Sequence, residues 1–234
     1  MKEEMQALNK NKAWELIPHS PHKKVIGCKW IYKVKYNVDD TVNHCKVGLI
    51  AKSYAQTHGI DYEETFAPVA KMTTIQIVLA LAVEKGWHLP QKDVKNAYLQ
   101  GELEDEVYMV QPPGFKLRSH PHAVCQLKKP LYGLKQATRA CHSKITQYLH
   151  QIGFKMSKSD NSLYVRRNFE SLIFIILYVD DLVIGGEELA DINKVKSLLF
   201  GKFEMKDMEE LHYLLGIEVI WTPKGIISPK STTS

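Results

Sequence analysis

The chain has 234 residues, of which 44% are hydrophobic and 24% are charged, which is enough to bury the sizeable core of a globular protein. Its net charge of +5 at pH 7 is modest. Its apolar stretches are far shorter than the roughly 20 residues of a membrane span. The amino terminus lacks the apolar core of a secretory signal, and the four cysteines lack Cys-x-x-Cys spacing. We therefore expect no membrane insertion, no zinc module and no disulfide framework.

A basic segment between residues 22 and 52 contains seven lysines against two aspartates, an excess that equals the surplus of the whole chain. From residue 29 to residue 36, lysines alternate with apolar and aromatic residues, which predicts a strand. Residues 37–40 would turn this strand into a second one, and the resulting hairpin could contact phosphates. A solvated lysine face would give the same pattern, so both interpretations stay open here. The lysines considered for nucleic-acid contact are Lys29, Lys33, Lys35, Lys46 and Lys52.

Three segments have the apolar spacing of helices. The first covers residues 75–85, with Thr74 as its cap and Gly86 as its stop, and its near-continuous apolar character predicts burial behind a sheet. The other two cover residues 139–152 and 189–200. All three apolar stripes are interpreted as core.

Residues 173–185 contain an acidic pair between two apolar runs, which predicts a tight β-hairpin with Asp180 and Asp181 at its turn. No lysine or arginine lies within five residues of the pair, so a bound cation is one way to hold two adjacent carboxylates there. Ordinary turn chemistry is the alternative, because aspartate tolerates the left-handed backbone conformations of such turns.

A third carboxylate, Asp93, follows an apolar stretch and precedes a short amphipathic segment, which places it at the end of a predicted strand. Alone, it has the pattern of a solvated turn residue. Together with the acidic pair it could complete a magnesium site, because hard cations take carboxylate oxygens and two-metal sites draw ligands from several segments.

The order of these carboxylates, with further motifs around them, resembles the reverse transcriptase domain of a copia-type LTR retrotransposon Pol polyprotein. Eight segments in family order carry the resemblance, at residues 14–18, 27–35, 59–70, 93–99, 107–115, 131–136, 178–181 and 213–219. The family implies an α/β (α+β) fold, a right-hand polymerase palm and fingers with an antiparallel palm sheet backed by helices.

The resemblance also implies a division of the chain. A reverse transcriptase domain would cover residues 1–227, with the fingers mainly at about 20–70 and 115–140, and residues 228–234 would be a truncated tail. The thumb and the RNase H domain of the family are expected to be absent. Without a thumb, we expect low processivity, because backbone contacts supply much of the affinity for nucleic acid.

The implied activity is RNA-directed DNA polymerisation, in which two Mg²⁺ ions about 4 Å apart clamp the attacking and leaving oxygens. Asp93, Asp180 and Asp181 would be the metal ligands and catalytic residues. The implied partners are an RNA or DNA template with its primer, deoxynucleoside triphosphates, and the RNase H and integrase segments of an intact element. The implied location is the cytoplasm, within a virus-like particle, or the nucleus.

Three further residues match family positions for nucleotide binding. Tyr98 would lie under the sugar and exclude a 2′-hydroxyl, and Gly133 and Lys135 belong to a segment near the nucleotide and template. From the residues alone, Tyr98 also fits a core aromatic and Lys135 a surface lysine.

The chain departs from the family pattern at several positions. Gly48 replaces an arginine that grips the triphosphate in the family, and Lys92 replaces an apolar residue beside Asp93, where we expect a buried, unpaired ammonium. Thr138 and Cys141 replace a proline and a tryptophan. These departures favour an alternative function, a catalytically inert remnant that keeps the fold and non-specific nucleic-acid binding.

Overall fold

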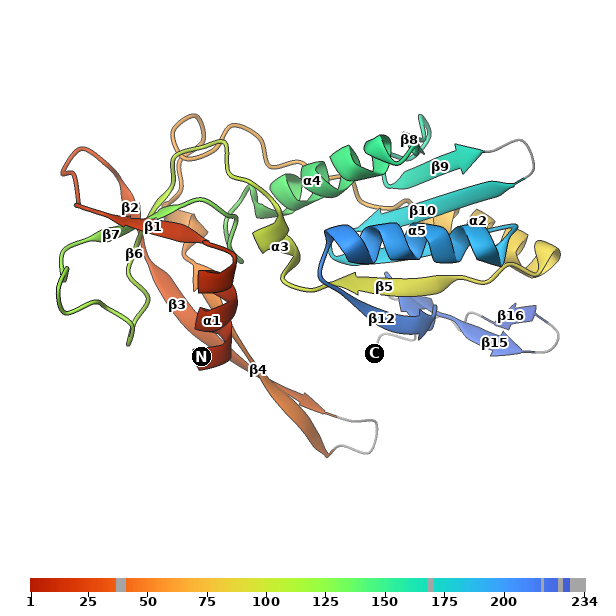
Figure 1. Ribbon diagram of the computed structural model, residues 1–234, viewed down its shortest axis with the longest axis horizontal. Helices are drawn as coiled ribbons and strands as arrows, with labels where there is room; N and C mark the ends of the chain where they lie inside the picture. Colours follow the sequence, from red (N-terminus) through yellow and green to blue (C-terminus); the bar gives the residue numbers. More distant parts are fainter. Residues whose placement is uncertain (37–40, 168–170, 216, 223–224, 228–234) are drawn as a thin grey trace. The chain divides into compact units, whose positions relative to one another are not determined.

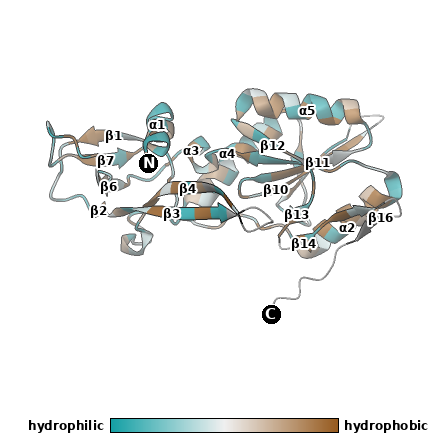
Figure 2. Cartoon of the chain, turned by 90° about the horizontal axis from the view of Figure 1, so that it is seen from below, coloured by the Kyte–Doolittle hydropathy of each residue, from teal (hydrophilic) through white to brown (hydrophobic). Residues whose placement is uncertain are grey.

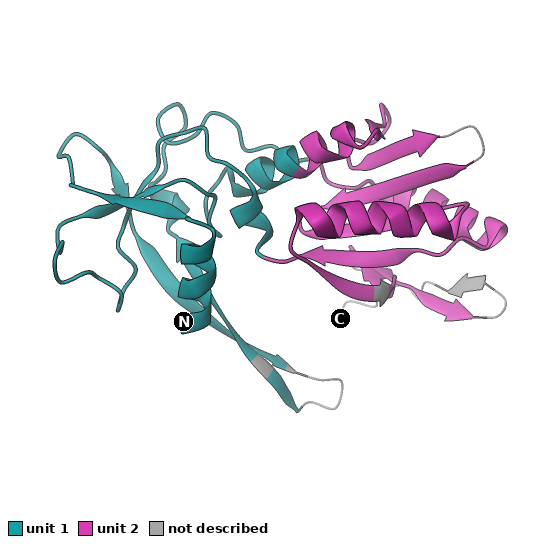
Figure 3. Cartoon of the chain, in the orientation of Figure 1, with its two compact units in different colours: residues 1–67, 96–144 teal, residues 68–95, 145–234 magenta. Residues whose placement is uncertain are grey.

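The computed structural model describes every residue outside 37–40, 168–170, 216, 223–224 and 228–234. The chain divides into two compact units, each assembled from two distant stretches of sequence (Figure 3). Unit 1 comprises residues 1–67 and 96–144, and unit 2 comprises residues 68–95 and 145–234. The predicted turn at residues 37–40 and the predicted tail at 228–234 lie outside the described residues.

Unit 2 is built on a six-stranded antiparallel sheet of order β12-β5-β11-β10-β9-β8 (Figure 1). Its strands are β5 (Pro90–Val94), β8 (Lys155–Met156), β9 (Leu163–Arg167), β10 (Leu172–Tyr178), β11 (Asp181–Gly186) and β12 (Met205–Glu210). Helices α2 (Met72–Lys85) and α5 (Leu189–Lys202) lie on opposite faces of this sheet (Figures 1 and 2). Because helices cover both faces, β10 and β11 are almost continuously buried and apolar.

The three predicted helices are present, with shifted bounds. Helix α2 begins three residues earlier than predicted, so its N-cap is Lys71 and not Thr74. Gly86 ends the helix, as predicted, and it adopts the left-handed conformation. Helices α4 (Ala137–Gln151) and α5 match the other two predicted segments closely. The predicted burial of α2 is only half right, because Ile77 is 60% exposed while Ile75 is buried.

Two short hairpins complete unit 2. In the first, β13 (Tyr213–Leu214) pairs with β14 (Ile217–Glu218), and in the second, β15 (Ile220–Thr222) pairs with β16 (Gly225–Ile227). The indole nitrogen of Trp221 donates a hydrogen bond to the Leu211 carbonyl (2.9 Å), which ties the second hairpin to the end of β12.

Unit 1 contains a four-stranded sheet and a separate long hairpin. The sheet has the order β1-β7-β6-β2 and comprises β1 (Trp14–Ile17), β2 (Val25–Ile26), β6 (Tyr108–Val110) and β7 (Val124–Leu127). The hairpin joins β3 (Cys28–Tyr36) to β4 (Val42–Ala51), and the predicted strand at residues 29–36 is β3. Helix α1 (Lys2–Lys10), the 3₁₀ helix η1 (Ser53–Ala55) and helix α3 (Ala97–Gln100) accompany them.

The architecture confirms the predicted class, an α/β protein whose largest sheet is antiparallel and backed by helices. Buried side chains form one core cluster within unit 1, around Ile26, Leu49 and Met109, and another within unit 2, around Ile75, Leu89 and Ile176. Among the residues described, no helix has the length and apolar character needed to cross a membrane.

Candidate active site and nucleic-acid interface

The acidic pair lies at the end of the β10–β11 hairpin, as predicted, but the turn is one residue earlier. Tyr178 pairs with Asp181, so the two loop residues are Val179 and Asp180, and Asp181 already belongs to β11. The left-handed residue is Val179 (φ 56°), a β-branched residue for which this conformation is strained. Turn chemistry therefore does not explain the aspartates, because neither of them occupies the left-handed position.

The sheet brings the third predicted carboxylate to the same place. Strand β5 pairs with β11 so that Asp93 lies directly opposite Asp181, and the Val94 amide donates a hydrogen bond to the Asp180 carbonyl (2.8 Å). All three aspartates are half-buried and belong to unit 2. The β5–β11–β10 register thus gathers, at one end of the sheet, carboxylates that lie 87 residues apart in sequence (positions 93 and 180).

The clustering changes the acidity of Asp181. Its pKa is raised to about 6, mainly by burial and to a smaller extent by the negative charges of Asp180 and Asp93, while a hydrogen bond from Gln91 (Nε2 to Oδ1, 3.1 Å) opposes the rise. A carboxyl group in this setting gains from a nearby cation, because positive charge would relieve both the desolvation and the repulsion.

The donor set suits magnesium, since three carboxylates offer only hard oxygen ligands. Within the part of the chain that the structure describes, however, no group of three or more His, Cys, Asp or Glu side chains is already arranged to hold a metal ion. The backbone register places Asp93, Asp180 and Asp181 together, and their side chains would have to turn toward a common point to bind an ion.

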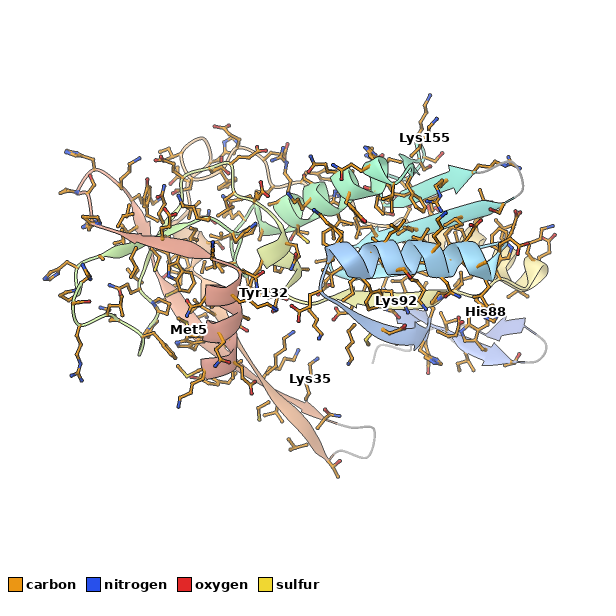
Figure 4. The ribbon with its side chains drawn as sticks, in the orientation of Figure 1. Met5, Lys35, His88, Lys92, Tyr132 and Lys155 are labelled. Carbon is orange, nitrogen blue, oxygen red and sulfur yellow. The ribbon has the colours of Figure 1, made fainter. Side chains whose placement is uncertain are left out.

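Lys92 is buried as predicted, with 1% of its surface exposed, but the prediction of an unpaired ammonium is wrong (Figure 4). Its register partner on β12 is Asp207, and the Lys92 ammonium donates a hydrogen bond to the Asp207 carboxylate. The ammonium of Lys196, on α5, lies 3.6 Å from the other carboxylate oxygen of Asp207. Burial lowers the pKa of Lys92, and the hydrogen bond to Asp207 opposes this decrease. The ion pair therefore reduces the cost of burying a charged group within the sheet.

Unit 1 presents the predicted lysines on one face of the β3–β4 hairpin, where Figure 4 labels Lys35. Lys29, Lys33 and Lys35 alternate along β3 and are exposed, and Lys46 lies directly opposite Lys33 in the register. Directly opposed like charges cost stability, so this arrangement favours a surface that meets a polyanion. Lys52 follows β4, and its amide donates a hydrogen bond to the Gly27 carbonyl (2.8 Å).

Gly48 lies on this lysine face, because its register partner is Ile31, between Lys29 and Lys33. A Cβ at Gly48 would meet nothing within 4 Å, and the backbone there is not left-handed. The fold therefore has no need of a glycine here, and a larger residue could stand at this position without a clash at its Cβ.

The residues predicted to contact the nucleotide belong to unit 1. Tyr98, on α3, packs its ring edge-to-face against Tyr132 (centroids 4.4 Å apart) and is half-buried against the unit 1 core. This ring contact is a structural reason for an aromatic residue at position 98. The role of Tyr98 in sugar selection stays a prediction.

Gly133 has a packing role of its own. Its φ of +90° favours glycine, and a Cβ would overlap the Ala51 carbonyl oxygen, because the loop presses against the end of β4. The Ala51 amide donates a hydrogen bond to the Tyr132 carbonyl (2.8 Å) in the same contact. The glycine thus allows the 131–136 loop to dock on the β3–β4 hairpin, and a contact with nucleotide stays a prediction.

Lys135 is held by a buried amide network. Its backbone N–H donates to Gln56 Oε1 (2.9 Å), Gln56 Nε2 donates to Gln136 Oε1 (3.0 Å), and Gln136 Nε2 donates to the Asp61 carbonyl (2.9 Å). The Lys135 ammonium lies over the ring of Tyr62, 5.6 Å from its centroid. The backbone at Lys135 is therefore fixed, which suits a residue that positions a ligand.

Sequence reasoning missed three residues of these sites: Gln91, Asp207 and Gln56. Gln91 could have been found, because it precedes Asp93 by two positions and a strand places both on one face. Asp207 pairs with a residue 115 positions away, and Gln56 with one 80 positions away, so only the tertiary structure reveals them.

Comparison with known proteins identifies the class. The family model described as reverse transcriptase (RNA-dependent DNA polymerase) matches residues 11–230. The retrovirus-related Pol polyproteins from transposons RE1 and RE2 of Arabidopsis thaliana are 47% and 45% identical over 97% of the chain. The corresponding polyprotein from transposon TNT 1-94 of Nicotiana tabacum is 39% identical over 94% of the chain.

The chain therefore belongs to the reverse transcriptase family, as the reverse transcriptase domain of a copia-type retrotransposon Pol polyprotein. It spans only 16% of the length of the RE1 and RE2 polyproteins and 17% of the TNT 1-94 polyprotein. Among solved structures, telomerase from Candida albicans in complex with a fragment of telomeric RNA aligns with a TM-score of 0.48 at 9% identity, covering all of this chain and 50% of that chain.

Proposed function

We propose that this domain is an RNA-directed DNA polymerase that transfers deoxynucleotides to a primer 3′-hydroxyl with the help of two Mg²⁺ ions. The observation that carries the proposal is the register that sets Asp93 opposite Asp181 with Asp180 in the adjoining turn. Bound there, the ions would supply positive charge to the attacking and leaving oxygens. The three aspartates would hold the ions, and Gln91 would orient the Asp181 carboxylate.

Unit 1 would supply the contacts to substrate. Tyr98 would exclude a 2′-hydroxyl, the fixed loop with Gly133 and Lys135 would contact the nucleotide, and the exposed lysines of the β3–β4 hairpin would bind phosphates of template or primer. Template, primer, deoxynucleotides and the other Pol segments are thus the proposed partners.

A second candidate, an inert remnant that retains nucleic-acid binding, is favoured by one observation. Gly48 occupies an open position in the middle of the lysine face, where a Cβ meets no neighbour and where the fold does not require glycine. A hydrogen bond to a charged group is worth about 1.5 to 3 kcal/mol, so a lost triphosphate contact would weaken nucleotide binding at least tenfold.

Primer extension on an RNA template with Mg²⁺ and deoxynucleotides tests both candidates. A working polymerase extends the primer, and Asp180→Asn abolishes extension without loss of folding. If the unaltered chain fails but Gly48→Arg extends the primer, the remnant is the correct assignment and the repaired site identifies the defect. Failure of the chain and of Gly48→Arg alike, with template binding intact, would reject the polymerase proposal.

A further inference from the structure

A cavity of about 470 Å³ lies within unit 1 where α1 joins β1, and its lining includes none of the residues assigned above to the candidate sites. Its lining includes three lysines, two asparagines and one tryptophan, namely Lys12, Lys128, Lys129, Asn9, Asn11 and Trp14. The size is in the range of small-molecule sites, and it suits one unit of a nucleic-acid chain.

The conformation of Lys12 is the first indication that the cavity is functional. Helix α1 ends with two backbone hydrogen bonds, from Lys12 to the Asn9 carbonyl (3.0 Å) and from Ala13 to the Leu8 carbonyl (3.0 Å), which define a Schellman motif. The motif requires a left-handed residue, and Lys12 adopts it with φ 49°.

Two other helices of the same chain end in the same pair of hydrogen bonds. After α2 and α4 the left-handed residue is glycine, Gly86 (φ 66°) and Gly153 (φ 90°). A lysine at this position strains the backbone, whereas glycine does not. Because strained residues cluster at functional sites, the strain marks the Lys12 side chain as a candidate ligand contact.

Charge is the second indication. Lys128 pairs with Glu15 (3.2 Å), whereas Lys12 and Lys129 form no ion pair within the described part of the chain. The backbone amides of Lys128 and Lys129 both donate to the Ala13 carbonyl (2.9 and 3.2 Å), which fixes this loop beside the end of α1. Two uncompensated positive charges therefore flank the cavity.

The third indication is Trp14, which lines the cavity and is half-buried against the unit 1 core. Aromatic faces bind bases by stacking, and neighbouring lysines bind the phosphates, which is how sequence-independent single-strand sites are built. The whole charge surplus also belongs to this unit: unit 1 has 17 Lys and Arg against 12 Asp and Glu, and unit 2 has 14 of each.

We propose that this cavity is a second contact for single-stranded nucleic acid, with phosphates on Lys12 and Lys129 and a base against Trp14. The inference rests on the proposed polymerase function in one respect, since the strand would be the template. Binding itself requires neither the aspartates nor magnesium, so the two proposals are tested separately.

The decisive variant is Lys12→Gly, because it removes the charge and the backbone strain together. Fluorescence anisotropy with a short labelled thymidine oligonucleotide, without Mg²⁺, should show affinity about fivefold lower at low salt and a salt slope smaller by about 0.7. The thermal unfolding midpoint should stay the same or rise. Trp14→Leu should also weaken binding, and Trp14→Phe should restore much of it.

Lys116→Ala is the matched control, since it removes one exposed lysine of the same unit outside the cavity. Equal weakening by Lys116→Ala and Lys12→Gly, or no oligonucleotide binding by the unaltered chain, would overturn the inference. Displacement of the oligonucleotide from the unaltered chain by inorganic phosphate as readily as by unlabelled oligonucleotide would reduce the cavity to an anion site and also overturn it. Asp180→Asn should bind like the unaltered chain, which separates this test from the extension assay.

Discussion

At the scale of single residues, Asp181 links stability to pH. Its pKa of about 6 in the folded chain lies above the value near 3.9 of an unfolded aspartate, so between these values the folded state binds more protons. Protonated Asp181 therefore stabilises the folded chain at low pH, and this contribution to the free energy of unfolding is lost as pH rises through 6. With chelator present, Asp181→Asn should be more stable than the unaltered chain at pH 7.5, and the difference should shrink toward pH 4, measured by urea unfolding.

Asp160 provides a control of opposite sign. Burial alone would raise its pKa, but hydrogen bonds from Thr74, Ser162 and the Lys71 amide together lower it. The Asp160 carboxylate therefore stabilises the folded chain at pH values above the pKa of an unfolded aspartate, and this stabilisation is lost as pH falls. Asp160→Asn should therefore destabilise the chain most at neutral pH. Parallel responses of the two variants would contradict the assigned pKa directions.

The buried pair of Lys92 and Asp207 makes a second prediction. Asp207→Ala removes the hydrogen-bond acceptor of a buried ammonium, and it should cost about 2 to 3 kcal/mol in the free energy of unfolding. Lys92→Met keeps the volume and should cost little, because Asp207 is half-exposed and keeps Lys196. In the double variant the cost of Asp207→Ala should largely disappear. Additive losses in urea unfolding would show that the two side chains are not coupled.

At the scale of elements, the loop that docks on β4 depends on one glycine. Gly133→Ala introduces a Cβ that overlaps the Ala51 carbonyl and a left-handed alanine, so it should lower the free energy of unfolding by about 3 kcal/mol. Gly48→Ala is the control, since that position is open and should change stability little. Unchanged stability of Gly133→Ala with weakened nucleotide binding would assign the glycine to the ligand and not to docking.

The β10–β11 hairpin is strained at Val179. Val179→Gly removes the left-handed strain of a β-branched residue and should raise the free energy of unfolding by about 1 kcal/mol, less whatever its half-buried side chain contributes. Gly185→Ala, later in the same hairpin, should do the opposite, because its Cβ would overlap the Phe174 ring. Destabilisation by Val179→Gly would mean that the side chain contributes more than the strain costs.

At the scale of the whole molecule, the uneven distribution of charge predicts where nucleic acid binds. Joint replacement of Lys29, Lys33 and Lys35 by alanine should reduce the salt slope of single-strand binding by about 2. Joint replacement of three exposed lysines of unit 2, Lys155, Lys158 and Lys194, should leave the slope nearly unchanged. Equal effects of the two triple variants, measured by anisotropy across a salt series, would show that net charge alone directs binding.

The sequence predicted local structure well where one segment carries the signal. The β3 alternation, the stop at Gly86 and the hairpin around the acidic pair follow from periodicity and turn residues within a dozen positions. It failed where the partner is distant, since Asp207 neutralises Lys92 across the β5–β12 register. It also placed the turn one residue late, because it assigned the left-handed position to an aspartate and the structure assigns it to Val179.

The interleaving of the two units has a consequence for biosynthesis. Residues 68–95, which include α2 and β5, leave the ribosome long before β11 and β12, the strands on either side of β5. Unit 1, by contrast, has its whole chain available once residue 144 has emerged. Helix α2 and strand β5 must therefore wait with their apolar surface uncovered, and during translation this segment is the natural target for chaperones and for premature aggregation.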